Sequence, residues 1–179
     1  DTAIPDRIKK INPILLITTH QMMALSKPLF ETLKDRIFFI EVVRHPLYMI
    51  KQQEENMISV TAQERDFDLQ IEYENQQIPF YAYGYEKEFL KASPIEKGIL
   101  FIEKFTDLSD ELKSKMDKNF RSRLITIPFE EFVLNPHEIM EQIAKGIGSK
   151  ITNCTLKEMK CQKVPRKKIA DGKSLAIYK

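Results

Sequence analysis

The sequence predicts an α/β fold with three layers, in which a mostly parallel sheet is flanked by helices. Residues 37–43 form a nearly continuous apolar run, as expected of a strand buried on both faces of a parallel sheet. Residues 14–17 and 123–127 are two further short apolar runs with the length of core strands. Helical spacing of apolar residues follows these runs, and alternating strands and helices imply parallel pairing.

The composition fits one globular domain spanning all 179 residues, since domains usually have about 100–200 residues. Hydrophobic residues make up 42% and charged residues 30%, as in ordinary soluble proteins. The formal net charge of +2 is too small to indicate a nucleic acid or an acidic membrane as partner. Apolar runs stay shorter than the roughly 18 residues of a membrane span, so we expect no span in this chain.

The two cysteines bear on whether the chain binds a metal and on the redox state of its compartment. Cys154 and Cys161 lie seven residues apart, a spacing that does not favour a disulfide, so we expect free thiols, with a disulfide as the alternative. Free thiols indicate a reducing compartment and therefore a cytoplasmic location. Two cysteines cannot make a zinc site alone, and the three histidines show no ligand spacing, so we expect no metal.

The first part of the chain carries the predicted sheet edge. Residues 1–12 are expected to form a short helix or a lead-in, and the strand at 14–17 ends in Thr18, Thr19 and His20. A short helix at 26–35 then precedes the strand at 37–43.

Arg44 and a helix beginning at Pro46 follow that strand. Proline suits the first position of a helix, and a guanidinium beside a helix N-terminus favours an anion such as phosphate. The ordinary alternative is a βα unit with a surface arginine.

The middle of the chain is less regular. Residues 54–77 read as a polar excursion from the sheet, with a short strand near 68–73. Residues 78–85 are rich in aromatic side chains, and their tyrosines (Tyr81, Tyr83 and Tyr85) would line a ligand pocket or pack beneath a lid. Two helices are expected next, at 86–105 with a division at Pro94 and at 108–120.

The C-terminal part ends in a basic segment. After the strand at 123–127, Asn135 is placed as an N-cap, with Pro136 at the first helical position and Glu138 at the spacing of a capping box. Residues 157–179 are basic, with KVPRKKIADGK at their centre.

The motifs, in this order, resemble the sulfotransferases that use 3′-phosphoadenylyl sulfate. The motifs are Thr-Thr-His at 18–20, Val-Arg-His-Pro about two dozen residues later, ITIPFEEFVLNP from residue 125, and the basic KVPRKK. The resemblance covers most of residues 14–52 and 124–168, while residues 54–119 match loosely. It implies a P-loop-transferase-like sulfotransferase core, with 3′-phosphoadenylyl sulfate as co-substrate and no metal.

The resemblance assigns roles at the first two strands. Sulfuryl transfer requires a base for the acceptor proton and fixed positive groups around the leaving phosphate. His20 occupies the place of the family's catalytic base, with a strand-end histidine as the structural alternative. Arg44 matches the arginine that grips the 3′-phosphate. Gln52 stands where the family has a serine on that phosphate, and Thr18 where it often has a lysine. His45 replaces an Asp or Asn and is interpreted as structural.

Further roles fall in the C-terminal half. Phe129 replaces the tyrosine of a Tyr-Glu-Asp motif, so it would stack on adenine without a hydrogen bond, or simply be core. Arg166, Lys167 and Lys168 resemble the family's basic loop over the 3′-phosphate. The alternative for these three is a solvated charged face.

The family's opening strand and P-loop-like turn, which hold the phosphosulfate, have no counterpart in this sequence. The single domain at 1–179 is therefore expected to be N-terminally incomplete, or the turn has been lost. The expected function is sulfuryl transfer to a hydroxyl or amine of a small-molecule or glycan acceptor. The alternatives are a non-catalytic nucleotide- or phosphate-binding module and a P-loop kinase relative, which would need Mg²⁺ and a Walker-type lysine.

Overall fold

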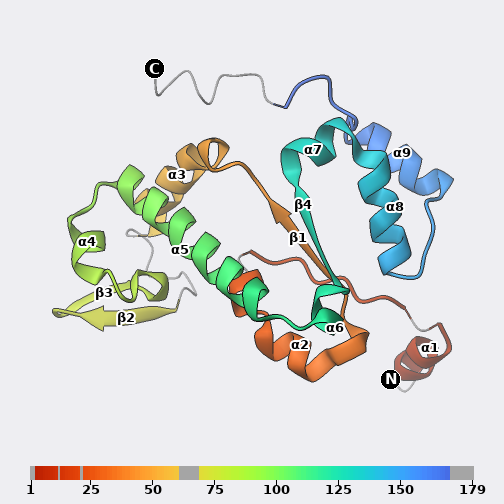
Figure 1. The fold of residues 1–179 in the computed structure, drawn as a ribbon, viewed down its shortest axis with the longest axis horizontal. Coiled ribbons are helices and arrows are strands. Elements are labelled where there is room, and N and C mark those ends of the chain that lie inside the picture. Colours follow the sequence, from red (N-terminus) through yellow and green to blue (C-terminus); the bar gives the residue numbers. More distant parts are fainter. Residues whose placement is uncertain (1–2, 12, 21, 61–68, 170–179) are drawn as a thin grey trace.

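The computed structural model describes residues 3–11, 13–20, 22–60 and 69–169, and within them the fold is mixed α/β (Figure 1). β1 (Phe39–Val43) pairs in parallel with β4 (Leu124–Pro128), with Phe39 opposite Leu124 and Val43 opposite Pro128. β2 (Gln70–Tyr73) and β3 (Gln76–Pro79) form a separate antiparallel hairpin. The predicted α/β class is confirmed, but the parallel sheet has two strands in the described part of the chain.

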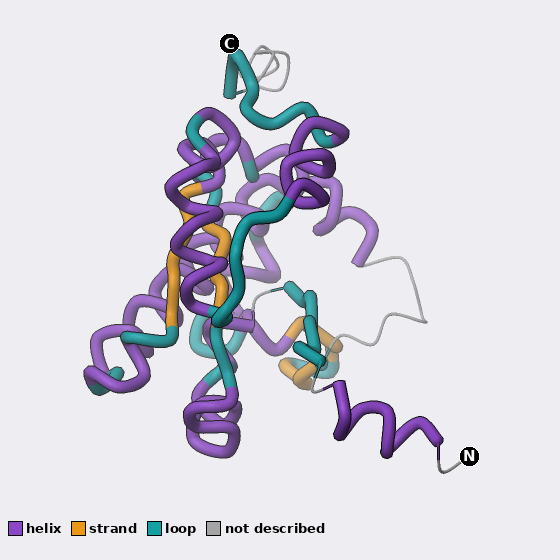
Figure 2. The backbone as a smooth tube through the Cα atoms, turned by 90° about the vertical axis from the view of Figure 1, so that its right-hand side faces the viewer, coloured by secondary structure: helices purple, strands orange, loops and turns teal. Residues whose placement is uncertain are grey.

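Helices make up most of the remaining structure. The α-helices are α1 (Ala3–Ile11), α2 (Lys27–Leu33), α3 (Ile50–Val60), α4 (Glu86–Lys91), α5 (Pro94–Lys115), α6 (Lys118–Arg121), α7 (Phe129–Leu134), α8 (Pro136–Gly146) and α9 (Asn153–Cys161). Short 3₁₀ turns are η1 (Met22–Leu25), η2 (Lys34–Arg36), η3 (Pro46–Tyr48) and η4 (Phe80–Ala82). Helix α1 projects from the rest of the chain and buries none of its residues (Figure 2).

The strand predicted at residues 14–17 is wrong. These residues adopt no regular structure, and their four aliphatic side chains are between 66% and 81% exposed. A buried strand requires a neighbour that accepts its backbone hydrogen bonds. Among the described strands, β1 pairs with β4 and β2 with β3, and the segment pairs with none of them.

The strand at 37–43 is confirmed as β1, but it is not buried on both faces. Glu41 is buried, whereas the side chains of Val42 and Val43 are exposed. Helices bury a parallel sheet only where they cover both faces, and Val42, at 58% exposure, lies on an uncovered side.

Several helix boundaries differ from the prediction. Pro46 opens the 3₁₀ turn η3, and α3 begins only at Ile50 and runs through the start of the predicted polar excursion to Val60. The division at Pro94 is confirmed, because Ser93 caps α5 and forms a capping box with Glu96. Helix α5 then continues to Lys115, so the predicted break before residue 108 is wrong.

Helix α8 starts at Pro136 as expected, but the predicted capping box is wrong. The side chain of Asn135 makes no capping hydrogen bond. Its backbone N–H donates to the carbonyl of Glu131 (2.8 Å), so the same residue also closes α7, which the sequence did not predict. This shared position gives Asn135 φ −130° and ψ 66°, away from the extended conformation usual for an N-cap.

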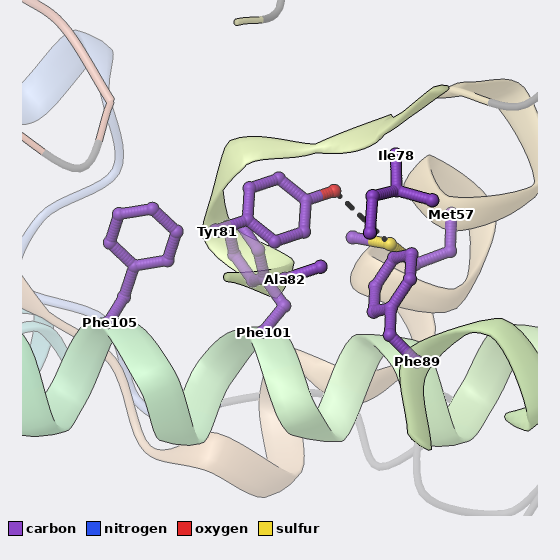
Figure 3. Close-up of a cluster of buried hydrophobic side chains, with 7 residues drawn as sticks. All are labelled: Met57, Ile78, Tyr81, Ala82, Phe89, Phe101 and Phe105. Atoms are coloured by element: carbon purple, nitrogen blue, oxygen red, sulfur yellow. Dashed lines mark hydrogen bonds between the residues drawn. The ribbon is translucent and has the colours of Figure 1, made fainter. Parts of the chain in front are cut away.

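The main core lies between α3, α5 and the β2–β3 hairpin (Figure 3). Its buried members are Met57, Ile78, Tyr81, Ala82, Phe89, Phe101 and Phe105. The Tyr81 hydroxyl donates to the sulfur of Met57 (3.5 Å), and its ring packs edge-on against Phe101. Packing is therefore the role of Tyr81, while Tyr83 is 70% exposed.

A second, smaller core lies at the amino end of the parallel sheet. Phe30, only 1% exposed, packs with Met23 and Met116 and stacks in tilted fashion on Phe39 and Phe120. This cluster joins α2 to the start of β1 and to α6. Elsewhere, Cys154 and Cys161 are exposed free thiols on α9, as expected.

Candidate anion-binding site

The site forms at the carboxyl edge of the parallel strands. Arg44 directly follows the last residue of β1, and Phe129 directly follows the last residue of β4. Because Val43 lies opposite Pro128 in the parallel register, these two residues leave the sheet at the same edge. This is the edge at which ligands bind in open α/β sheets.

Arg44 is held by two aromatic rings and one carboxylate. Its Cζ lies 5.5 Å from the ring centroid of Phe129 and 5.9 Å from that of Tyr48, within the range of cation–π contacts. Its Nε lies 4.0 Å from Oε1 of Glu130. The side chain remains 40% exposed, so its guanidinium is accessible to solvent at this edge.

Arg166 reaches the same ring from the C-terminal segment. Its Cζ lies 5.7 Å from the centroid of Phe129, and its backbone N–H donates to the carbonyl of Val133 (2.6 Å). Val133 is buried in α7, so this hydrogen bond anchors the basic segment to a fixed helix. Lys167 and Lys168 follow directly and are exposed.

The turn after β1 is organised by His45. Its N–H donates to Oε1 of Glu130 (3.1 Å), and its Nδ1 accepts the N–H of Leu47 (3.3 Å). Its ring meets Tyr48 edge-on at 5.8 Å. These contacts agree with the structural interpretation of His45 made from the sequence.

The predicted helix N-terminus beside Arg44 is wrong, because a three-residue 3₁₀ turn separates that arginine from α3. The favourable dipole of a long helix therefore does not act at this turn. Positive charge at the sheet edge comes from the guanidinium groups of Arg44 and Arg166.

Two predicted residues lie outside this cluster. His20 is exposed on the irregular segment 13–20, and its carbonyl accepts a long hydrogen bond from Thr19 (3.5 Å). Gln52 is exposed on α3. Within the described part of the chain, no hydrogen bond, ion pair or ring contact joins either residue to Arg44.

Sequence reasoning missed Tyr48 and Glu130 as parts of the site. Tyr48 stands four residues after Arg44, a spacing that brings side chains together when the chain coils. Glu130 is the residue after Phe129, in the Glu position of the motif that carried the resemblance. The spacing and the motif were the available signals for these two residues.

Neither a metal-binding cluster nor a membrane-spanning helix occurs in the part of the chain that the structure describes. Its His, Cys, Asp and Glu residues form no cluster of three or more that could hold a metal ion. None of its helices is both long and apolar enough to cross a membrane.

No match to this chain was found among protein-family models, curated proteins or solved structures. The assignment of a function therefore rests on the motifs and on the geometry at the sheet edge.

Proposed function

We propose that this chain binds the 3′-phosphate end of 3′-phosphoadenylyl sulfate and transfers its sulfuryl group to a hydroxyl or amine of a small-molecule or glycan acceptor. One observation carries the proposal. Arg44, Phe129 and Arg166 are far apart in the sequence, and the resemblance assigned all three to the nucleotide. They meet at a single edge of the parallel sheet.

Two guanidiniums suit a phosphate chemically. Each presents planar pairs of N–H donors that match phosphate oxygens, and charge-assisted hydrogen bonds contribute about 1.5–3 kcal/mol. Both arginines contact Phe129, so this ring supports the cations directly. Lys167 and Lys168 add charge next to Arg166 and strengthen the attraction of an anion from solution.

His20 is the proposed base. It would take the proton of the acceptor hydroxyl or amine as the acceptor oxygen or nitrogen bonds to sulfur and the bond from sulfur to the phosphate oxygen breaks. The bisphosphate nucleotide then leaves, its charge offset by the arginines. Gln52 would supply a further amide donor to the 3′-phosphate. The cytoplasmic location stays a prediction.

A non-catalytic binding module on the same core is the second candidate. Two observations favour it: His20 lies on an exposed segment outside the sheet, and no P-loop-like glycine turn occurs in the sequence. Binding of the nucleotide without turnover of any acceptor would support this second candidate.

Calorimetric titration with adenosine 3′,5′-bisphosphate tests the binding step. Arg44→Ala should weaken binding by roughly 10- to 100-fold, since it removes charge-assisted hydrogen bonds of about 1.5–3 kcal/mol. Arg36→Ala is the matched control, because Arg36 precedes the amino end of the same strand. Equal affinities of the two variants, or no binding by the unaltered chain, would contradict the assignment of Arg44.

A further inference from the structure

We infer that Glu130 is a positioning residue that orients the Arg44 guanidinium for a phosphate. The inference rests on the proposed function, since it concerns the same arginine. Glu130 is the second residue of α7, and its side chain is only 17% exposed. Its negative charge lies beside an arginine that is proposed to bind an anion.

A single oxygen of Glu130 serves both the turn and the arginine. Oε1 accepts the N–H of His45 (3.1 Å) and lies 4.0 Å from Nε of Arg44. The hydrogen bond to a backbone N–H fixes the carboxylate, because His45 is itself held by its bond to Leu47. The position of the carboxylate is therefore set by the turn, and it forms an ion pair with Arg44 in which Nε is the guanidinium nitrogen 4.0 Å away.

This pairing leaves the outer edge of the guanidinium for a ligand. Nε is the guanidinium nitrogen that lies 4.0 Å from Glu130, and Phe129 and Tyr48 lie beside the guanidinium, so the two terminal nitrogens are the donors available to a ligand. Two terminal nitrogens form parallel hydrogen bonds to two oxygens of one phosphate. Pre-orientation lowers the entropy lost when an arginine side chain is immobilised on binding.

Positioning and simple charge make opposite predictions. A carboxylate near a bound phosphate repels it, so removal of the charge should tighten binding if Glu130 has no positioning role. If Glu130 orients Arg44, the same removal frees the guanidinium and weakens binding. The sign of the change therefore distinguishes the two explanations.

The test is calorimetric titration of Glu130→Gln with adenosine 3′,5′-bisphosphate. Glutamine keeps the size of the side chain and a carbonyl oxygen for the His45 N–H, but it loses the charge that pairs with Arg44. We expect the affinity to fall by roughly fivefold or more, about 1 kcal/mol. Glu131→Gln, an exposed neighbour on α7, removes the same charge and should not weaken binding. Unchanged or tighter binding by Glu130→Gln would overturn the inference.

A measurement without ligand keeps this inference separate from the proposed function. The backbone-independent nitrogen relaxation of the Arg44 Nε signal, assigned by its loss in Arg44→Lys, should report an ordered guanidinium in the unaltered chain and a mobile one in Glu130→Gln. An identical signal in both proteins would refute the positioning role whether or not the nucleotide binds. If the signal changes but the unaltered chain does not bind the bisphosphate, the positioning role stands and the proposed function fails.

Discussion

Replacement of Lys113 by methionine should destabilise the protein, because it leaves the buried carboxylate of Glu41 on β1 without its counter-charge. Glu41 is buried in the middle of β1, and its Oε2 lies 2.9 Å from Nζ of Lys113 on α5. The hydroxyl of Thr126 on β4 donates to the same oxygen (2.7 Å). The carboxylate therefore joins both parallel strands to the long helix, and Lys113→Met leaves it buried without its main counter-charge.

The size of the effect follows from the burial of both partners. Removal of one member of a fully buried ion pair costs about 3–5 kcal/mol, whereas exposed pairs contribute about 0–1 kcal/mol. The side chain of Glu41 is 10% exposed and that of Lys113 is 27% exposed, so this pair lies closer to the buried limit. Solvent at the lysine and the remaining bond to Thr126 reduce the loss. We expect the free energy of unfolding to fall by about 2–3 kcal/mol.

Equilibrium unfolding in urea measures this loss, with Lys115→Met as the matched control. Lys115 lies on the same helix and pairs with Glu111, but both of those side chains are more than half exposed. Its replacement should therefore cost less than about 1 kcal/mol. Adding Glu41→Gln to Lys113→Met should restore part of the stability, because it removes the unpaired charge. Equal losses for the two lysine variants would refute the reasoning.

Two further predictions concern stability. Burial, with a contribution from Glu103, raises the pKa of Tyr85 to about 12 from its ordinary 10.0. The neutral phenol therefore contributes to the free energy of unfolding, and this contribution is fully present below pH 10 and lost as the pH rises through 12. Urea unfolding should give a lower free energy of unfolding at pH 11 than at pH 8, and Tyr85→Phe should reduce this difference. In Gly146→Ala, the added Cβ would overlap the ring of Phe38, and because this ring is only half-buried and must shift, we expect a loss of about 1 kcal/mol, measured by the same unfolding assay. Adding Phe38→Leu should recover part of this loss, and an unaltered stability of Gly146→Ala alone would contradict the packing argument.

The sequence predicts the β1–β4 edge well because its signals there are local. An apolar run of strand length ends at Arg44, and another leads to Phe129, so both residues are placed by the ends of strands that do form. The run at 14–17 gave the same signal and failed. The length of an apolar run indicates a tendency to be buried. A strand also requires a second strand to pair with, and that pairing depends on distant parts of the chain.

The contacts that complete the site likewise depend on distant parts of the chain. Arg166 joins Phe129 only because the C-terminal segment hydrogen-bonds to α7, and α7 itself was not predicted. Likewise, Glu130 pairs with Arg44 because the register of two parallel strands sets their ends side by side. Residue type identified the candidates for charge and stacking, while strand register determined which of them meet.

Substitutions near the end of β1 should therefore affect either ligand binding or stability, depending on the position. Successive side chains of a strand point to opposite faces, so Glu41 faces α5 while Val42 is exposed. Arg44 lies beyond the last strand pair, where its partners are rings and a carboxylate at the surface. Loss of Arg44 removes a proposed ligand contact and little buried area, whereas loss of Lys113 unbalances a buried charge and leaves the sheet edge intact in molecules that remain folded. Because the candidate site depends on the alignment of β1 with β4, substitutions at other positions that keep this pair in register should preserve the contacts of Arg44 with Phe129 and Glu130.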